Sequence, residues 1–280
     1  MIIVADSGST KTDWRIITKD KIIPASTKGL NPYFMSPEEM IDELFQNEIL
    51  HQVSPLEIQA VYFYGAGLSA QDKIEELSQT LSAFFKQAKK INVASDMLGA
   101  ARAVLGNTSG VACILGTGSN SCVYNGKEIK ENIPALGYVL GDEGSGADLG
   151  KYFLQAYFYG ELPAEIMHDF KTFIQLTDDE IIESVYRKPL PNRFLASIAP
   201  FIAGYKHTEP VKKILNQRFL VFVEKHILPY HHPNTQIGFC GSIAYYFRNE
   251  IQTVLQQNNL SLGQVTKTPV EELVKFHVNK

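Results

Sequence analysis

Short apolar runs divided by polar turns open the chain. Ile2–Ala5 and Trp14–Ile17 have the length of β-strands, and the segment between them is rich in serine, threonine and glycine. This pattern predicts a β-hairpin with a tight polar loop. It returns around Gly116–Ser121, which is flanked by the apolar runs Val111–Leu115 and Cys122–Tyr124. We therefore expect a strand, a polar turn and a strand twice, about one domain length apart.

Strands and helices alternate between the two hairpins. Ser36–Glu39 predicts the start of a helix, with serine as the N-cap and proline at the first helical position, and the helix is expected to reach about Leu50. We predict further strands at Lys21–Ala25, Ile58–Tyr64 and Ile91–Ala94, and further helices from Ser69 to about Lys89 and over Gly99–Leu105. The alternation predicts an α/β fold.

Long helical segments dominate the second half. We predict helices at Leu149–Tyr159, over much of Pro163–Tyr205 and at Val211–Ile227. A strand at Ile237–Cys240, a helix from Ile243 and a last helix at Val270–His277 complete the pattern. Because no linker rich in glycine, proline or serine separates the halves, we expect them to pack against each other around a cleft.

The length of 280 residues favours two domains over one. We expect the first domain over residues 1–113 and the second over residues 114–280, with the last helix, at about 269–277, able to pack back on the first. Hydrophobic residues make up 45% of the chain and charged residues 20%. This ordinary globular composition excludes a disordered, coiled-coil or collagen-like chain.

Charge and hydropathy exclude several partners. The net charge of -4 argues against a nucleic-acid surface, which needs an excess of lysine and arginine. No apolar stretch approaches the ~20 residues that span a bilayer, and the N-terminus lacks the basic start and long apolar region of a signal peptide. We therefore expect a cytoplasmic protein that binds neither nucleic acid nor membranes.

The first hairpin loop has the chemistry of a phosphate site. Gly8 allows close approach, and hydroxyl groups, backbone N–H groups and one positive charge are supplied by Ser9, Thr10, Lys11 and Thr12. Asp6 is placed to hold Mg²⁺, directly or through water. An ordinary polar hairpin turn is the alternative, and the spacing does not fit a Walker A loop. A second loop of the same kind, formed by Gly116, Thr117 and Gly118, favours phosphate binding.

Five segments, taken in order, resemble one protein family. They are Asp6–Thr12, Ala94–Asp96, Gly116–Asn120, Gly137–Gly146 and Gly238–Ser242. The chain resembles, over nearly its whole length, the N-acetylglucosamine kinase branch grouped with the BadF/BadG/BcrA/BcrD-type ATPases, within the actin-like ATPase, sugar kinase and Hsp70 superfamily. This resemblance implies an α/β fold of two ribonuclease H-like domains that flank a cleft, with a helical insertion in the second.

The resemblance also implies roles for individual residues. Asp96 follows a predicted buried strand, where α/β sheets place their ligands, and it matches the aspartate that accepts the proton of the sugar hydroxyl. A helix N-cap is the alternative role for Asp96. Contacts with ATP are implied for Gly8, Ser9, Thr10, Lys11, Gly116, Thr117, Gly118, Gly241 and Ala244. Sugar contacts are implied for Asn31, Asp96, Ser119, Asn120, Gly137 and Asp142.

The implied activity is ATP-dependent phosphorylation of an amino sugar, with ATP and Mg²⁺ as cofactors. N-acetylglucosamine, phosphorylated at the 6-hydroxyl, is the leading substrate, and glucosamine and N-acetylmuramic acid are its neighbours. Leu136 departs from the pattern, because animal N-acetylglucosamine kinases carry tryptophan there. The roles of Asp142 and Glu143 are not separated, and a homodimer is compatible with the resemblance.

Two other functions stay open at this point. An activator ATPase of the BadF type would need cysteines that ligate an iron–sulfur cluster, and Cys113, Cys122 and Cys240 do not match such a set. A non-catalytic sensor of sugar or nucleotide would keep the binding residues without turnover.

Overall fold

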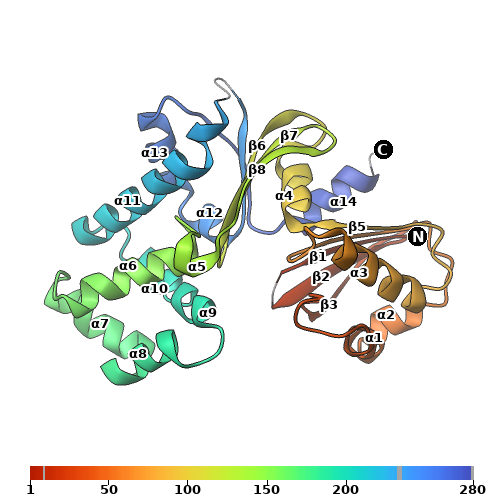
Figure 1. Cartoon of the computed structure of the whole chain (residues 1–280), viewed down its shortest axis with the longest axis horizontal. Helices are drawn as coiled ribbons and strands as arrows, with labels where there is room; N and C mark the ends of the chain where they lie inside the picture. Colours follow the sequence, from red (N-terminus) through yellow and green to blue (C-terminus); the bar gives the residue numbers. More distant parts are fainter. Residues whose placement is uncertain (9, 232–234, 279–280) are drawn as a thin grey trace. The chain divides into compact units, whose positions relative to one another are not determined.

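Two five-stranded sheets organise the chain, one in each of two structural units (Figure 1). The computed structural model describes residues 1–8, 10–231 and 235–278. The first unit combines Met1–Gly106 with Pro269–Lys280, and the second is Asn107–Thr268. The expected boundary at 113/114 falls inside strand β6 (Ser109–Leu115), which belongs entirely to the second sheet.

The sheet of the first unit has the strand order β3-β2-β1-β4-β5. Its strands are β1 (Ile2–Ser7), β2 (Lys11–Ile17), β3 (Ile22–Lys28), β4 (Ala60–Gly65) and β5 (Ile91–Ser95). The first three are antiparallel neighbours, which confirms the predicted hairpin, whereas β4 and β5 run parallel to β1. Ser7 pairs with Gly65, and Gly65 pairs with Ser95. The carboxyl ends of the three parallel strands therefore lie level at one edge.

Helices cover both faces of this sheet. They are α1 (Pro37–Gln46), α2 (Glu48–Val53), α3 (Gln71–Phe84), α4 (Asp96–Leu105) and α14 (Val270–Val278). One core joins α1, α2 and α3 to the sheet around Trp14 and Phe63, while α4 and α14 pack together on β1 and β4. The single helix expected from Ser36 to Leu50 was wrong. Asn47 leaves the helical conformation, and its side chain accepts a hydrogen bond from Leu50 N, which starts α2.

The sheet of the second unit repeats the same plan, in the order β10-β9-β6-β7-β8. After β6 come β7 (Ser119–Asn125), β8 (Ile129–Ile133), β9 (Ile237–Cys240) and β10 (Leu262–Thr266). The second predicted hairpin, β6 and β7, is confirmed, but β7 begins at Ser119. Ser119 and Asn120 therefore belong to a strand and not to the loop.

A series of helices follows the β8 strand before the chain returns to β9. They are α5 (Gly137–Leu140), α6 (Gly146–Phe158), α7 (Ala164–Ile174), α8 (Asp178–Tyr186), α9 (Pro191–Ala196), α10 (Ala199–Gly204), α11 (Glu209–His226) and the 3₁₀ turn Leu228–Tyr230. After β9 come α12 (Ser242–Tyr246) and α13 (Arg248–Gln257). Phe153, Phe170 and Phe201 meet edge to face within this helical region and anchor its core.

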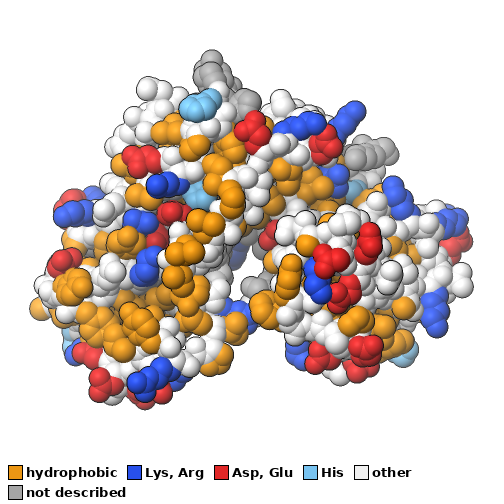
Figure 2. All heavy atoms as spheres, in the orientation of Figure 1, with side chains coloured by type: hydrophobic (Ala, Val, Ile, Leu, Met, Phe, Trp, Pro, Cys, Tyr) orange, Lys and Arg blue, Asp and Glu red, His pale blue; other side chains and the backbone are white. Residues whose placement is uncertain are grey.

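The surface mixes charged and apolar side chains. Figure 2 shows lysine and arginine interspersed with aspartate and glutamate on the face that it displays. Large apolar side chains are exposed on the helices of the second unit or directly after them, among them Phe158, Tyr159 and Phe173. Among the described residues, no helix is both long enough and apolar enough to span a bilayer.

Gly150 provides a test of the packing of α6 on α9. A Cβ at Gly150 would lie 2.0 Å from the Leu195 carbonyl oxygen, whereas one at Gly204 would meet nothing within 4 Å. We expect Gly150→Ala to lower the free energy of unfolding by about 1–3 kcal/mol, because the two helices must move apart. Gly204→Ala, the control, should be neutral or slightly stabilising. Urea denaturation measures both, and equal effects would contradict the packing.

Candidate active site

Two carboxylates lie at the carboxyl edge of the first sheet. Asp6 is the penultimate residue of β1, in register with Asp13 on β2, and Asp96 is the first residue of α4, directly after β5. The N-cap alternative for Asp96 was wrong. Ser95 is the N-cap, since its side chain accepts a hydrogen bond from Leu98 N, and Asp96 Oδ1 accepts one from Met97 N at 2.8 Å. Asp96 is therefore not needed to begin the helix.

These carboxylates sit in an unfavourable electrostatic environment. Burial, followed by the negative charges of Asp96 and Asp13, raises the pKa of Asp6 to about 7. Burial also raises the pKa of Asp96, although the backbone hydrogen bond from Met97 opposes that rise. Lys11, on the neighbouring strand β2, forms its ion pair with Asp13 at 2.7 Å. In the described chain, neither Asp6 nor Asp96 forms an ion pair. This edge of the sheet therefore holds two carboxylates whose charge is not neutralised by a cation.

This donor set fits a magnesium ion. Mg²⁺ is typically held by one or two carboxylates together with water and phosphate oxygens, rather than by a complete protein cage. Asp6 and Asp96 interact electrostatically, and a cation beside them would relieve the repulsion that raises the pKa of Asp6. Among the described residues there is no cluster of three or more metal-ligating side chains, so any such ion would complete its shell with other ligands.

The first hairpin loop is only partly as expected. Gly8 N donates to the Lys11 carbonyl oxygen at 3.0 Å, and Thr10 and Lys11 are exposed. Ser9 lies outside the described residues. Thr12, expected to offer its hydroxyl to phosphate, instead points inward, where it is wholly buried and bonded to the Lys28 carbonyl oxygen. Thr12 therefore serves the structure and not the loop.

The inward hydroxyls of the hairpin position Asn31. Ser7 and Thr12 share a 2.8 Å hydrogen bond, and both accept from Leu30 N. Asn31 follows directly, is buried, and its Oδ1 accepts from Tyr33 N at 2.9 Å. A Cβ at Gly67, just past the end of β4, would lie 2.9 Å from that oxygen. The amide of Asn31 is thus held beside the carboxyl edge that carries the two acids.

In the second unit, the loop Gly116–Gly118 is locked onto the start of α6. Gly116 N donates to the Gly118 carbonyl oxygen, while the carbonyl oxygens of Gly116 and Thr117 accept from Gly146 N and Ala147 N. These bonds fix the loop between β6 and β7. The backbone of this short turn is therefore preorganised.

A cavity of about 390 Å³ opens beside this loop. Its lining combines the loop with small side chains of α9 and α10 and with α12, namely Gly116, Thr117, Ala196, Ala199, Pro200, Ala203, Ser242, Ile243, Tyr246 and Phe247. Its volume and mostly apolar lining are those of a small-molecule pocket. The recurrence of alanine at 196, 199 and 203 is a small-residue pattern at helical spacing that sequence reasoning missed.

Gly241, which precedes α12, allows the backbone to pass close to β6 beside this cavity. Its φ of 121° lies in the region that favours glycine, and a Cβ there would lie 2.2 Å from the Leu115 carbonyl oxygen. The start of α12 can therefore lie against the end of β6. Ala244, expected to contact ATP, is wholly buried, and the cavity is lined by Ser242 and Ile243 before it.

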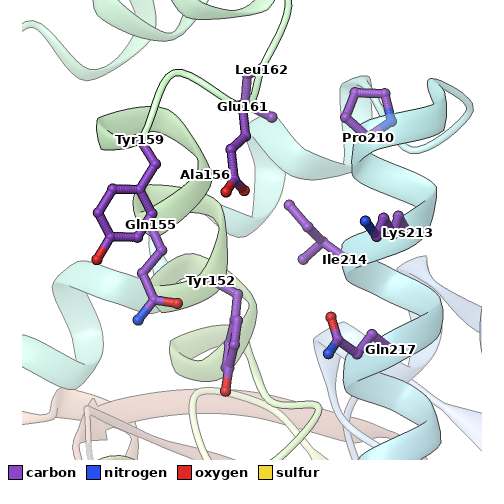
Figure 3. Close-up of a pocket in the computed structure, with 10 residues that line it drawn as sticks. All are labelled: Tyr152, Gln155, Ala156, Tyr159, Glu161, Leu162, Pro210, Lys213, Ile214 and Gln217. Carbon is purple, nitrogen blue, oxygen red and sulfur yellow. The ribbon is translucent and has the colours of Figure 1, made fainter.

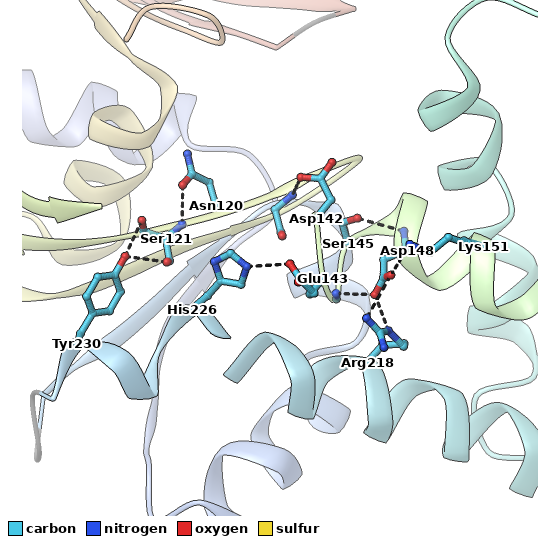
Figure 4. A network of polar contacts seen from close by, with 12 residues as sticks. Asn120, Ser121, Asp142, Glu143, Ser145, Asp148, Lys151, Arg218, His226 and Tyr230 are labelled. Carbon is cyan, nitrogen blue, oxygen red and sulfur yellow. Dashed lines mark hydrogen bonds and ion pairs between the residues drawn. The ribbon is translucent and has the colours of Figure 1, made fainter. Parts of the chain in front are cut away.

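The acidic segment, residues 141–145 between α5 and α6, is held by three sets of contacts (Figure 4). Asp142 Oδ1 accepts from Ser119 N at 3.1 Å, and Glu143 Oε2 bonds His226 Nε2 at 3.0 Å. Asp148 accepts from Gly144 N at 2.9 Å, and its carboxylate forms an ion pair with Arg218 at 2.7 Å. We find no sequence signal that pairs these partners, because His226 and Arg218 come from α11.

The two neighbouring acids differ in their environments. Burial raises the pKa of Asp142, partly offset by the hydrogen bond from Ser119. Burial acts most strongly, to raise the pKa of Glu143, but the hydrogen bonds from His226 and the backbone and the charges of His226 and Arg218 together outweigh burial, and the pKa is lowered. Glu143 is thus committed to His226, whereas Asp142 accepts the Ser119 N–H through one of its two carboxylate oxygens.

Two polar groups next to Asp142 add to the site. Ser119 Oγ is buried without a hydrogen-bond partner in the described structure, an arrangement that is costly unless a ligand or water completes it. Asn120 Oδ1 accepts from Ser121 N and from Asn132 Nδ2, which leaves the Asn120 amide nitrogen as its donor. Gly137 begins α5 with a positive φ and open space around it.

Solved structures extend the family resemblance to the whole chain. A candidate N-acetylglucosamine kinase from Porphyromonas gingivalis is 43% identical, with 100% of this chain and 99% of that chain covered and a TM-score of 0.94. The chain belongs to the N-acetylglucosamine kinase family of sugar kinases. A curated N-acetylmuramic acid/N-acetylglucosamine kinase from Clostridium acetobutylicum is 26% identical over 211 residues, 70% of this chain and 68% of the relative.

More distant structures share the sugar kinase fold. A candidate N-acetylglucosamine kinase from Chromobacterium violaceum has a TM-score of 0.74 at 17% identity, with 98% of each chain covered. A ROK family glucokinase from Streptomyces griseus, solved with glucose and AMPPNP, has a TM-score of 0.59 at 13% identity, over 98% of this chain and 97% of that one. No protein-family model matches the chain.

The raised pKa of Asp6 predicts that this residue lowers the free energy of unfolding by an amount that depends on pH. A carboxyl whose folded pKa is raised stabilises the fold at acid pH and loses that contribution as pH rises through the folded value, here about 7. Asp6→Asn should therefore raise the free energy of unfolding by an amount that grows between pH 4 and 7 and levels off above, reaching on the order of 2–4 kcal/mol.

Urea denaturation without divalent cations, from pH 4 to pH 8, measures this effect. Asp20→Asn, which changes an exposed carboxylate between β2 and β3, is the matched control and should leave the profile unchanged. If the free energies of unfolding of Asp6→Asn and of the unsubstituted chain change with pH in parallel, the ionised Asp6 carboxylate does not destabilise the fold.

Proposed function

We propose that this chain phosphorylates an amino sugar with ATP, and that N-acetylglucosamine is converted to its 6-phosphate. One observation carries the proposal: the partly enclosed Asp96 carboxylate, with a raised pKa and no structural duty as an N-cap, stands beside Asp6 at the carboxyl ends of the parallel strands β1, β4 and β5. A base works best when its pKa approaches the working pH, and a buried carboxylate is tuned in that direction.

Asp96 acts as the general base in this proposal. Its carboxylate accepts the proton of the sugar hydroxyl as the hydroxyl oxygen forms a bond to the γ-phosphorus of ATP. The bond between that phosphorus and the β–γ bridging oxygen breaks, and ADP leaves with the electron pair. Positioning and charge stabilisation account for most of the catalysis in such transfers.

The nucleotide is assigned to the second unit. The cavity beside Gly116 and Thr117 supports this, because its alanine-rich and aromatic walls suit a planar base, and the preorganised loop lies at one side of it. Gly118 of the same loop would add phosphate contacts, and the hairpin of the first unit offers its own phosphate-binding groups at Gly8, Thr10 and Lys11. Mg²⁺ held by Asp6, directly or through water, would neutralise negative charge on the phosphates.

Each unit offers hydrogen-bonding groups that suit a sugar. Asp142 offers acceptor oxygens, while the Asn120 amide nitrogen and the Ser119 hydroxyl offer donors. Asn31 supplies a fixed amide, and Gly137 leaves room at the start of α5. A site made of such groups rejects analogues that lack a hydroxyl, because its buried polar atoms would lose their partners.

Substitution of Asp96 tests the base. Asp96→Asn keeps an oxygen that can accept from Met97 N, so the fold and ATP affinity should persist while kcat falls by about 10² to 10⁴. Asp72→Asn, an exposed acid in the first turn of α3, is the control and should retain activity. Steady-state kinetics with calorimetric measurement of ATP binding separates the two effects. A kcat near that of the unsubstituted protein would remove Asp96 from its role.

ADP release across a panel of sugars tests the reaction itself. The panel contains N-acetylglucosamine, glucosamine, N-acetylmuramic acid, N-acetylmannosamine and glucose, with Mg²⁺-ATP and a control without sugar. We expect strong stimulation by N-acetylglucosamine. Equal turnover in every well would favour an ATPase that serves a partner, and retained ligand binding without turnover would favour a sensor.

A further inference from the structure

A second cavity, of about 420 Å³, lies between α6 and α11 in the second unit (Figure 3). Its residues are Tyr152, Gln155, Ala156, Tyr159, Glu161, Leu162, Pro210, Lys213, Ile214 and Gln217. None of them belongs to the lining of the cavity assigned to the nucleotide or to the acidic segment around Asp142. The cavity therefore needs its own explanation.

An acid and a base face this cavity without an ion-pair partner in the described chain. Glu161 follows the end of α6, and Lys213 lies on α11, so the two charges come from opposite walls. Figure 3 shows the Glu161 carboxylate directed into the space between the helices. The two charges are not paired with each other, since ion pairs within 4.0 Å include neither residue. Lys212, next to Lys213, pairs with Glu209 instead.

The remaining walls suit a compact polar molecule. Gln155 and Gln217 carry amide groups that both donate and accept hydrogen bonds, and Tyr152 and Tyr159 offer aromatic rings. Ile214 and the buried Leu162 supply apolar surface. Because Glu161 and Lys213 are exposed on separate walls and form no ion pair with each other, a matching ligand carries one positive and one negative group at two positions.

We propose that this cavity binds a small zwitterion in which an ammonium group and an anionic group are separated across a ring or short chain. The ammonium pairs with Glu161, the anionic group pairs with Lys213, and the body of the molecule lies on the tyrosine rings. A carboxylate or a phosphate can serve as the anion, because Lys213 offers a point charge to either.

The cavity is connected to the acidic segment through packed polar groups. Tyr152 lines the cavity, and the Arg218 guanidinium lies 4.0 Å from the centre of its ring. Arg218 pairs with Asp148, which accepts from Gly144 N beside Asp142 and Glu143. A ligand that packs on Tyr152 therefore acts on the contacts that hold the acidic segment. If the proposed function holds, occupancy should change the KM for the sugar.

Calorimetric titration tests binding without any reliance on activity. Muramic acid supplies an ammonium and a carboxylate, and glucosamine 6-phosphate supplies an ammonium and a phosphate. Glucosamine and N-acetylglucosamine 6-phosphate, each lacking one of the charges, are the control ligands, and any binding of theirs at the proposed active site should be the same in Glu161→Gln and Lys213→Met as in the unsubstituted chain. We expect at least one of the two zwitterions to bind, and the arm that binds identifies the anion.

Matched surface variants locate the site. Glu161→Gln and Lys213→Met should each weaken binding at least about tenfold, because each removes a charge-assisted contact. Lys212→Met changes the adjacent exposed lysine and should leave the affinity unchanged. Loss of affinity in the first two variants alone supports the proposal. Equal affinity in all three variants, or no binding of either zwitterion at millimolar concentration, overturns it.

Kinetics then tests the connection to the acidic segment. In the unsubstituted chain, the bound zwitterion should change the KM for the sugar about fivefold, and Lys213→Met should abolish that change. An unchanged KM with the zwitterion bound overturns the connection. A chain that binds the zwitterion but phosphorylates no sugar contradicts the proposed function alone.

Discussion

The ion pair between Asp148 and Arg218 is the constraint on which the second unit depends. Both side chains are almost wholly buried, and the pair also satisfies Gly144 N. Breaking such a pair leaves an uncompensated buried charge, which costs far more than the pair itself contributes. Since Asp148 lies on α6 and Arg218 on α11, the pair ties the acidic segment to the helical core. The position of Asp142 is set by this ion pair and by the hydrogen bond that Asp142 accepts from Ser119 N.

The first unit, in contrast, contains two carboxylates that no ion pair neutralises in the described chain. Asp6 and Asp96 are partly buried, and neither forms an ion pair in the described chain, while Lys11 pairs with Asp13. A stable structure would pair or remove these carboxylates. Groups left in an unfavourable environment by the fold are typical of functional sites, where the cost is recovered when a ligand arrives. The contrast with the satisfied pair at Asp148 therefore supports the proposed roles of Asp6 and Asp96 in the active site.

Much of the fold and part of the candidate site could be predicted from the sequence, because the sequence patterns that indicate them are local. The hairpins at β1–β2 and β6–β7 follow from apolar runs and glycine turns, and Asp96 was placed from its position after a strand. The strands β8 and β10 were missed, since Ile129–Ile133 carries a polar centre and Leu262–Thr266 is short and contains glycine. Partners from distant helices, such as His226 for Glu143, leave no local pattern.

The two sheets share one plan but differ in charge at their hairpin ends. In the first unit the pair Ser7 and Thr12 closes the hairpin, and the pair one step inside it is Asp6 and Asp13. In the second unit Leu115 and Ser119 close the hairpin, and the corresponding inner pair is Ile114 and Asn120. Negative charge is thus concentrated in the first unit at this position, while the second presents an apolar and an amide group. An anionic nucleotide is repelled less by the second arrangement, and a cation or a proton is attracted more by the first. This difference in one residue pair is therefore consistent with the proposal that the first unit holds the cation and the second unit holds the nucleotide.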